Sequence, residues 1–320
     1  MGKIDKNYVM QDAGIRFGWL DGEFLPWEQC KIHMYCQVVR YGFRTFEGIR
    51  AYWNNEQQEL YLFRVQDHLS RLEDSNKLMR ISIPYTKADI EKIIVELFRK
   101  NEFKRDSYVQ PSPYIGMGGL MASSSEDAFM GLMIGAVPFP STEGRNIVKK
   151  ACVSSWRRIS DDMQPPRIKA GPNYMNSRFA NIESRVGGYG NAIMLNNRGK
   201  VSEGLGTCVL MIRKGVPVTP PVTADILEGL TLDTIARLLK DEIGLDTVER
   251  EVDRTELYVA DEVMLLGTGS EILALGTIDG LQIGNGGEGP ITRKVRQLYF
   301  DAARGRNPKY SHWLTPVYRK

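Results

Sequence analysis

The first 137 residues show short runs of alternating hydrophobic and polar positions, interrupted by two longer stretches with helical spacing. An Asp-Gly pair at Asp21 and Gly22 separates the first two runs, and this dipeptide favours the tight turn of a β-hairpin. Leu69 and Leu72 recur at helical spacing in the first longer stretch. The expected strands are 17–20, 23–25, 49–53, 59–63, 109–115 and 128–137, and the expected helices are 66–79 and 87–99. The pattern predicts a small α+β domain that ends near residue 137.

A segment with two prolines and several small polar residues, 138–146, follows as the predicted interdomain linker. Apolar runs resume after it and continue to the end of a larger domain, 147–320. Its expected strands are 147–153, 192–195, 200–202, 208–213, 216–219 and 261–266, and its expected helices are 174–186 and 231–241. Strands and helices do not alternate regularly, so the fold class is a mixture of α/β and α+β rather than a doubly wound sheet.

Composition excludes several classes of partner. The 320-residue chain is 42% hydrophobic, which is enough for a real core. Its formal net charge of +3 is small and its basic residues are dispersed, so no nucleic-acid partner is expected. No apolar run reaches the roughly 18 residues of a membrane span, and residues 1–6 lack the apolar core of a signal peptide. We therefore expect no membrane partner.

The cysteines and histidines limit the redox and metal chemistry. The cysteines are scattered without a Cys-x-x-Cys pair, which favours reduced thiols in a cytoplasmic protein. The histidines form no His-x-x-x-His or similar cluster, so no metal site is expected. The positions concerned are Cys30, Cys36, Cys152, Cys208, His33, His68 and His312.

The second domain carries a lysine, a carboxylate and two loops of glycine and threonine, in that order. They lie in segments 167–174 (RIKAGPNY), 201–206 (VSEGLG), 227–231 (LEGLT) and 267–272 (GTGSEI). A lysine bonds an aldehyde, a carboxylate keeps a ring nitrogen protonated, and such loops wrap a phosphate. These parts together indicate a phosphorylated aldehyde cofactor.

These segments resemble the branched-chain amino acid aminotransferases, which use pyridoxal 5'-phosphate on the fold called type IV. Four further segments match the family in order and spacing, and the resemblance runs from Arg16 to about Phe300. They are 41–52 (YGFRTFEGIRAY), 63–80 (FRVQDHLSRLEDSNKLMR), 260–263 (ADEV) and 289–292 (GPIT). The resemblance implies a two-domain fold type IV aminotransferase with its cofactor at the domain interface.

The resemblance assigns the catalytic role to Lys169, which bonds the cofactor's aldehyde and moves the substrate proton. Burial would lower the pKa of this lysine and make it a better nucleophile. Glu203 is the expected partner of the pyridine nitrogen, with a solvated turn glutamate as the alternative. Tyr174 is expected at the phenolic oxygen, and Gly206 lets the backbone approach the flat ring.

The cofactor phosphate is assigned to two loops and one arginine. Arg71 is the side-chain clamp, although its position alone suggests an exposed helix arginine. Leu227 belongs to the loop before a predicted helix, and Leu230 and Thr231 stand where that helix begins, so that backbone N–H groups there suit an anion. Thr231 could equally be a plain N-cap. The cup is completed by Thr268, although Gly/Thr loops also form ordinary turns.

Substrate-binding roles are carried over in the same way. Four of these residues could equally belong to the core, namely Tyr41, Phe46, Gly48 and Arg50. An aromatic box suits an aliphatic side chain. The residues are Tyr41, Phe46, Gly48, Arg50, Tyr108, Gln110 and Gly269.

Two departures from the family pattern concern the substrate. The family's Tyr-Ile-Arg-Pro is Tyr-Val-Gln-Pro here, so that Gln110 replaces the arginine thought to bind the side-chain carboxylate of glutamate. Arg44 is our hypothesis for a substitute cation, because the family usually has a small residue there. The second departure is Thr207-Cys208, where the family commonly has Glu-Asn.

The expected reaction moves the amino group of an L-branched-chain or other aliphatic amino acid to a 2-oxo acid. The alternative is a fold type IV transaminase or lyase of a specialised pathway that uses an unusual amino acid and a donor other than glutamate. A D-amino acid transaminase would carry an Arg-x-His trap, and the chain has none. A cofactor-free binding protein is a third alternative. The family also implies at least a homodimer, and no function is inferred for the basic, aromatic stretch 303–320.

Overall fold

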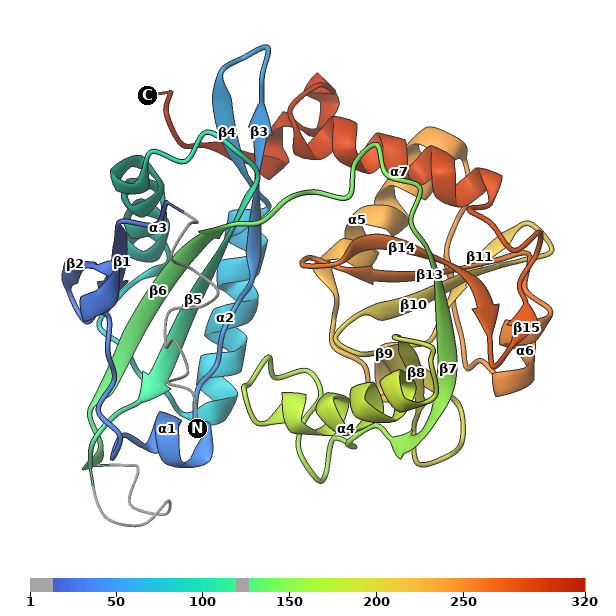
Figure 1. Cartoon of the computed structure of the whole chain (residues 1–320), viewed down its shortest axis with the longest axis horizontal. Helices are drawn as coiled ribbons and strands as arrows, with labels where there is room; N and C mark the ends of the chain where they lie inside the picture. The colour runs from blue at the N-terminus through green and yellow to red at the C-terminus, as the bar shows by residue number, and fades with distance from the viewer. Residues whose placement is uncertain (1–13, 119–126, 320) are drawn as a thin grey trace, which may run out of the picture. The chain divides into compact units, whose positions relative to one another are not determined.

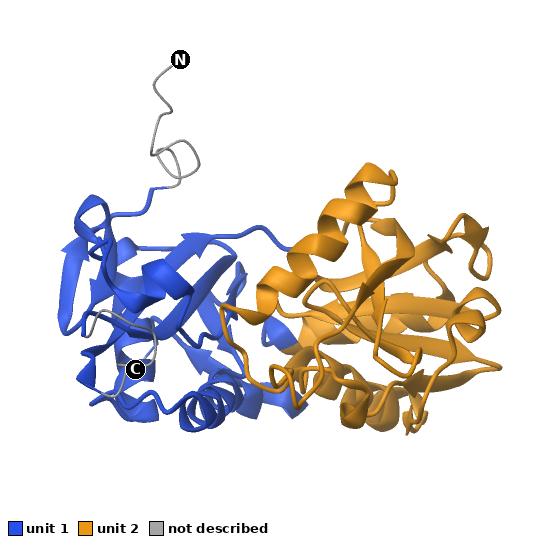
Figure 2. Ribbon diagram, turned by 90° about the horizontal axis from the view of Figure 1, so that it is seen from below, with its two compact units in different colours: residues 1–141, 303–320 blue, residues 142–302 orange. Residues whose placement is uncertain are grey.

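The structure, a computed structural model, describes residues 14–118 and 127–319 and divides the chain into two units (Figure 2). Unit 1 contains residues 1–141 and 303–320, and unit 2 contains residues 142–302. The chain passes from unit 1 to unit 2 between residues 141 and 142, inside the expected linker, 138–146. The expected larger domain differs, because its last residues return to unit 1 and make the two units nearly equal in length. The expectation about residues 1–6 lies outside the described residues.

Unit 1 is built on a seven-stranded sheet with the order β16-β4-β3-β5-β6-β1-β2 (Figure 1). Neighbouring strands are antiparallel, and β1 and β2 form the hairpin that Asp21-Gly22 predicts. The strands are β1 Phe17–Leu20, β2 Glu23–Pro26, β3 Ile49–Asn54, β4 Glu59–Phe63, β5 Ser107–Ile115, β6 Met130–Pro138 and β16 Leu314–Pro316. The helices are α1 Gln37–Tyr41, α2 Val65–Met79, α3 Lys87–Asn101 and the 3-10 turns Trp27–Gln29 and Pro308–Trp313.

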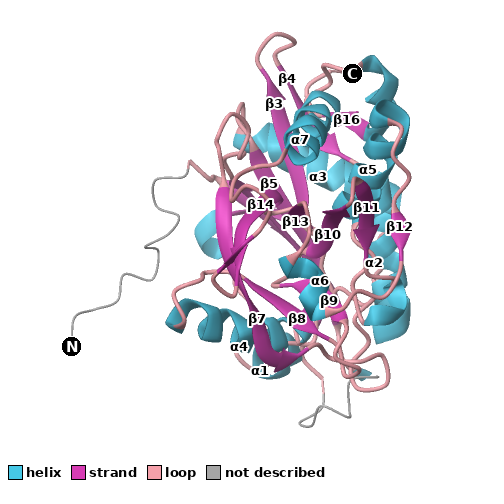
Figure 3. Ribbon diagram, turned by 90° about the vertical axis from the view of Figure 1, so that its right-hand side faces the viewer, coloured by secondary structure: helices cyan, strands magenta, loops and turns pink. Residues whose placement is uncertain are grey.

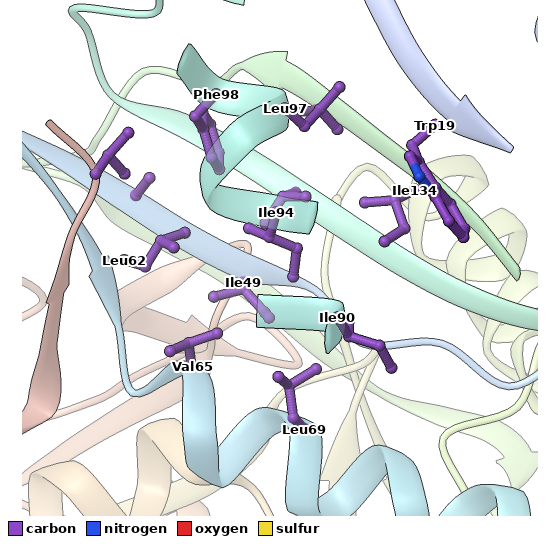
Figure 4. Close-up of a cluster of buried hydrophobic side chains, with 14 of the residues drawn as sticks. Trp19, Ile49, Leu62, Val65, Leu69, Ile90, Ile94, Leu97, Phe98 and Ile134 are labelled. Atoms are coloured by element: carbon purple, nitrogen blue, oxygen red, sulfur yellow. The ribbon is translucent and has the colours of Figure 1, made fainter. Parts of the chain in front are cut away.

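Helices α2 and α3 cover one face of this sheet. Their apolar positions, including Leu69 and Ile94, pack against Ile49, Leu62 and Trp19 of the strands (Figure 4). Each of these side chains is at most 3% exposed, so the apolar spacing of both helices is used for the core. The side chains that alternate with Val109 along β5 point to the other face of the sheet.

The returning C-terminal segment completes unit 1. Strand β16 pairs antiparallel with β4, and the fully buried carboxylate of Glu59 accepts the backbone N–H groups of Val317, Tyr318 and Arg319 at 2.7–3.0 Å. A buried carboxylate that accepts three N–H groups of the returning segment holds this end of the chain in place. Residues 303–319 therefore have a structural role in unit 1.

Unit 2 is built on a nine-stranded sheet with the order β12-β11-β10-β13-β14-β7-β8-β9, with β15 paired to β14. Pairs β14–β7, β7–β8 and β11–β12 are parallel, and the remaining neighbours are antiparallel. The strands are β7 Val148–Arg157, β8 Ala192–Leu195, β9 Val201–Gly204, β10 Cys208–Arg213, β11 Val216–Thr219, β12 Val248–Glu249, β13 Glu262–Gly267, β14 Glu271–Ile278 and β15 Leu281–Gln282. The helical segments are α4 Asn173–Val186, Val222–Ala224, α5 Leu230–Leu238, the π-helical turn Leu239–Ile243, α6 Arg254–Tyr258 and α7 Pro290–Ala303.

Helix α4 packs against β7 and β8, and α5 packs against β13 (Figure 3). Strands β10 and β13 are buried along nearly their whole length, which explains why their apolar runs are continuous rather than alternating. The loop between β9 and β10 and the loop after β13 carry two of the sequence motifs.

Two large elements of unit 2 were missing from the sequence prediction. Strand β14 lies between β13 and β7, and its run of apolar residues contains Gly276, which resembles a break. Helix α7 begins at Pro290, directly after Gly289. Both residues suggest a turn, but proline is well tolerated in the first turn of a helix.

Over the described ranges 14–118 and 127–319, no helix is both long and apolar enough to cross a membrane.

Candidate active site

Lys169 lies on the segment between β7 and α4, next to Tyr174 in the first turn of that helix. The side-chain nitrogen of Lys169 donates a hydrogen bond to the Tyr174 hydroxyl at 3.0 Å. Lys169 is half-buried and Tyr174 is 38% exposed, so the full burial expected of the lysine is not reached within unit 2. The lysine and the tyrosine thus form one polar pair that solvent and small molecules can reach.

Asn173 holds the lysine segment in its place. Its buried side-chain amide donates to the backbone oxygens of Ile168 at 2.9 Å and Pro165 at 3.0 Å. These bonds close the loop on both sides of Arg167 and fix the start of α4. The asparagine of the lysine motif therefore has a structural role that the sequence prediction did not supply.

Glu203 stands near the end of β9 and is only 3% exposed, so the alternative of a solvated turn glutamate is wrong. One carboxylate oxygen accepts a hydrogen bond from the Arg158 guanidinium at 2.8 Å. The other oxygen accepts the backbone N–H of Leu227 at 2.9 Å. The bond to Leu227 ties the glutamate to the first Gly/Thr loop.

Gly206 and Gly267 bring the loops into contact with the lysine–tyrosine pair. Gly206 has φ +85°, and a Cβ atom there would stand 3.5 Å from the Tyr174 ring. A Cβ atom on Gly267 would lie 3.1 Å from the Gly206 backbone oxygen and 3.0 Å from Thr207. The 203–208 turn is therefore adjacent both to Tyr174 and to the loop that contains Thr268.

Thr207 is a polar residue of this loop cluster that sequence reasoning treated only as a departure from the family. Its side chain is 7% exposed, and its hydroxyl oxygen is buried with no hydrogen-bond partner in the part of the chain that the structure describes. A buried hydroxyl normally has a partner. The orphaned oxygen marks a place where a polar ligand atom fits.

Helix α5 presents its N-terminus to the same cluster. The helix begins at Leu230 after the N-cap Gly229, and no side chain caps it. Thr231 is therefore inside the helix, and the alternative of Thr231 as a plain N-cap is wrong. A Cβ atom on Gly229 would lie 2.4 Å from the sulfur of Cys208, so this close approach needs glycine. An uncapped helix N-terminus is a favourable place for an anion.

Unit 2 thus brings together most of the predicted cofactor residues. Direct contacts link the lysine segment, the 203–208 turn and the two Gly/Thr loops. The predicted residues on these four segments are Lys169, Tyr174, Glu203, Gly206, Leu227, Leu230, Thr231, Thr268 and Gly269.

Arg71 belongs to unit 1, where it is bound to a buried carboxylate. It donates from Nε to one oxygen of Glu47 at 2.7 Å and from a terminal nitrogen to the other at 2.8 Å. The Nδ1 atom of His68 also lies 2.7 Å from a carboxylate oxygen of Glu47. Only 11% of the Arg71 side chain is exposed, so the suggestion of an exposed helix arginine is wrong. Its role as a phosphate clamp stays a prediction.

Glu47 is fully buried and is the central group of this cluster. Burial alone would raise the pKa of its carboxyl, but the charge and hydrogen bonds of Arg71 and the hydrogen bond of His68 outweigh burial. The net effect is a pKa well below the ordinary range, so Glu47 is a carboxylate at neutral pH.

The predicted substrate residues of unit 1 differ in their surroundings. Gly48 leaves room for Tyr108, because a Cβ atom there would overlap the tyrosine hydroxyl. Arg50 is 2% exposed and donates to the backbone oxygen of Phe139 at 2.9 Å. Phe46 is buried and Tyr41 is at the exposed end of α1. Their roles toward a substrate stay predictions.

The open face of β5 borders a cavity of about 380 Å³ in unit 1. Tyr108, Gln110 and Ser112 alternate along the strand and line the cavity from one face. Arg44 lies on the same cavity, and its terminal nitrogen is 3.4 Å from the Gln110 side-chain oxygen and 3.3 Å from the Ser112 hydroxyl. The cation of the sequence hypothesis thus lies beside Gln110, the position at which the family has an arginine.

Sequence reasoning missed Arg158, Thr207, Asn173 and Glu47. Arg158 and Glu47 form ion pairs across long stretches of sequence, so that no local pattern identifies their partners. Glu47 lies in segment 41–52, which matches the family, but the sequence alone did not indicate a role for it.

Comparisons with known proteins identify the family of this chain. The model of the family described as amino-transferase class IV matches residues 44–278. The chain is 36% identical over 316 residues, 98% of this chain and 100% of the relative, to a probable branched-chain-amino-acid aminotransferase of Aquifex aeolicus.

Two solved structures are similar over nearly the whole chain. The branched-chain amino acid aminotransferase of Thermobaculum terrenum in its PLP form is 40% identical with a TM-score of 0.92, covering 96% of this chain and 100% of that one. The T.th. branched-chain amino acid aminotransferase, complexed with N-(5'-phosphopyridoxyl)-L-glutamate, is 32% identical with a TM-score of 0.88, covering 94% and 98%. The chain belongs to the class IV aminotransferases, enzymes of fold type IV.

Proposed function

We propose that this protein is a pyridoxal phosphate-dependent aminotransferase that moves the amino group of an L-branched-chain or other aliphatic amino acid to a 2-oxo acid. The observation that carries the proposal is the cluster in unit 2, where Lys169, Tyr174 and Gly206 meet and Glu203 is held in the adjoining turn. Both of the solved relatives described above are branched-chain amino acid aminotransferases, one in a PLP form and one with a phosphopyridoxyl compound.

The residues present fit this cofactor. The unpartnered Thr207 hydroxyl, the uncapped start of α5 and the closely packed glycines offer a cradle for a phosphate on a flat ring. When bound, pyridoxal phosphate supplies an aldehyde that takes up the amino group and a ring that accepts electrons. We assign Leu230 and Thr231 at the N-terminus of α5, and Thr268 in its loop, to the phosphate.

Each polar residue of the cluster has a separate task. The amine of Lys169 takes the proton from the substrate Cα and gives it up again later in the transfer. The Tyr174 hydroxyl lies 3.0 Å from the Lys169 nitrogen and orients the lysine. With the cofactor bound, Tyr174 would hold its phenolic oxygen, and the carboxylate of Glu203 would favour a proton on its ring nitrogen.

The unit 1 cavity supports an aliphatic substrate. Its apolar wall includes Trp27, Met133 and Val137, and Tyr108 and Gln110 supply polar groups on one face. A largely apolar pocket with a few polar groups selects side chains by shape. We assign this cavity to the side chain of the amino acid.

The same cavity supports a dicarboxylate as the amino donor. Arg44 offers a cation beside Gln110, where the family has an arginine, and the T.th. relative was solved with a glutamate compound. A charge-assisted bond from a guanidinium offsets the loss of solvent around a carboxylate. The other candidate function, a transaminase that cannot use glutamate, is less favoured for this reason.

We propose that the active enzyme is at least a homodimer in the cytoplasm. Four apolar residues of α4 form an exposed stripe at helical spacing, and the last of them is 86% exposed. They are Met175, Phe179, Ile182 and Val186. A second copy of the chain would cover this stripe, and Ile182→Glu should then produce monomers in light scattering.

A visible absorption spectrum tests the proposed function directly. The purified protein with pyridoxal phosphate should show a band near the position of a protein-bound cofactor, and L-leucine and L-glutamate should each bleach it. Lys169→Ala is the matched control, in which no such band forms. A wild-type protein without this band would overturn the proposal, and bleaching by leucine alone would favour the second candidate function.

A further inference from the structure

Arg158 is a buried cation beside the proposed cofactor site and has no part in the mechanism described above. It follows β7 directly, and its backbone N–H donates to the oxygen of Leu195 at 2.9 Å. The residue is 5% exposed. Its terminal nitrogens lie 2.8 Å from a Glu203 oxygen and 3.4 Å from the side-chain oxygen of Asn176. The guanidinium is therefore fixed by strand position and points at the glutamate.

The pair is poorly explained as a device for stability alone. The Nε atom of Arg158 is buried without a hydrogen-bond partner among the described residues. An unmade hydrogen bond of a buried donor costs about 1–3 kcal/mol. A buried ion pair is also often no more stable than an apolar pair of the same volume. The positive charge at this position therefore calls for an explanation in the chemistry of Glu203.

A buried carboxylate tends to take up a proton, because burial disfavours its charged form. The nearby guanidinium opposes this tendency, and the bond from the Leu227 N–H does the same at the other oxygen. Glu203 is thus held as an anion in a fixed orientation. A ring nitrogen beside it then keeps its own proton, whereas a neutral glutamic acid would leave the ring uncharged.

We infer that Arg158 is a positioning residue that keeps Glu203 anionic and so sets the protonation of the cofactor's ring nitrogen. This inference rests on the proposed function. In this inference Arg158 acts on the ring through Glu203, so its loss should change the electronic state of the bound ring more than it changes cofactor binding.

The test is the ¹⁵N chemical shift of ring-labelled pyridoxal phosphate bound to the full-length enzyme. Wild type and the charge-conserving Arg158→Lys should both show a protonated ring nitrogen at pH 7. Arg158→Gln should move the signal toward the unprotonated position. The kcat for L-leucine in this variant should fall about 10- to 100-fold, the range seen when partners of metal-site ligands are lost, with a smaller change in KM.

Arg296→Gln is the matched control in the same unit. Arg296 is 8% exposed, pairs with Glu288 at 3.2 Å and likewise has a buried Nε without a partner among the described residues. Its loss should leave the ¹⁵N shift unchanged. The inference is overturned if Arg158→Gln keeps the protonated signal, or if Arg296→Gln moves the signal equally.

Arg158→Met provides a second neutral variant if the glutamine variant does not fold, because an apolar side chain of similar length avoids an unpaired polar group. Its ¹⁵N shift should match the shift expected for Arg158→Gln. A wild-type protein that binds no cofactor would overturn the proposed function itself. A wild type with a protonated ring and a methionine variant with the same shift would overturn only the role of Arg158.

Discussion

Each unit of this protein contains a buried glutamate–arginine pair next to predicted site residues, and the two pairs are built differently. In unit 1, both oxygens of Glu47 accept hydrogen bonds from one Arg71 guanidinium at 2.7 and 2.8 Å. In unit 2, Arg158 reaches one oxygen of Glu203, and a backbone N–H of the cofactor loop holds the other.

The difference indicates which member of each pair orients the other. In unit 1 the two-pronged contact fixes the plane of the guanidinium, so the glutamate serves to orient the arginine. In unit 2 the arginine and the loop together orient the carboxylate, so the arginine serves the glutamate. The same two residue types therefore have opposite roles, and mutation should separate them.

The largest effect is expected from removing the unit 2 carboxylate. Glu203→Ala should lower kcat roughly 1,000-fold, in the range for loss of one preorganised electrostatic partner. Steady-state kinetics with L-leucine measures this, and a cofactor titration should show that binding persists. A loss of less than about threefold in kcat would contradict the chemical role of Glu203.

The unit 1 carboxylate should instead affect stability. Glu47→Gln leaves Arg71 buried beside a neutral group, which should lower the free energy of unfolding by about 3–5 kcal/mol. Urea denaturation measures this loss. The control is Glu73→Gln, which removes the exposed partner of Lys87 and should cost less than about 1 kcal/mol. Equal losses in the two variants would refute the structural role of Glu47.

Arg44 extends the comparison to an arginine whose neighbours, Gln110 and Ser112, are neutral. Arg44→Ala should raise the KM for L-glutamate about 10- to 100-fold, because a charge-assisted hydrogen bond contributes about 1.5–3 kcal/mol. The KM for L-leucine should change less than about threefold. Arg16→Ala removes an exposed arginine of the same unit and serves as the control. Unchanged glutamate turnover in Arg44→Ala would remove the arginine from the donor site.

The smallest expected effect is a difference in pH dependence. Folding lowers the pKa of Glu47 from its ordinary value of 4.5, so its stabilisation is complete above that value and is lost as the pH falls. The stability gap between wild type and Glu47→Gln should therefore narrow below pH 4.5, by at most about 1.4 kcal/mol per pH unit. Arg71 and His68 face the same carboxylate and are present in both proteins. A gap that widens in acid would contradict this linkage.

Local sequence patterns predicted much of the fold. The hairpins and the two helices of unit 1 followed from alternation, turn residues and helical spacing, and strands β10 and β11 were predicted with the bounds that the structure has. Strand β14 and helix α7 were missed because Gly276 and Pro290 resemble breaks. The return of residues 303–320 to unit 1 depends on long-range contacts, such as those of Glu59, that no local pattern reveals.

The candidate site was predictable where motifs are continuous in sequence. The lysine segment and the three Gly-containing loops were located from their residues and order, and unit 2 brings them into contact. The partners Arg158 and Glu47 could not be predicted, because each pair joins residues on separate elements and depends on burial. A departure from the family pattern suggested Arg44 as a substitute cation. Arg44 lies beside Gln110, and its role toward the donor stays a prediction.

The most direct test of the central claim is to locate the lysine that bonds the cofactor. The enzyme would be loaded with pyridoxal phosphate, reduced with borohydride, digested and examined by mass spectrometry. The account predicts one phosphopyridoxyl group, on the peptide that contains Lys169, and none in Lys169→Ala. A modification on another lysine, or an equal modification in Lys169→Ala, would contradict it.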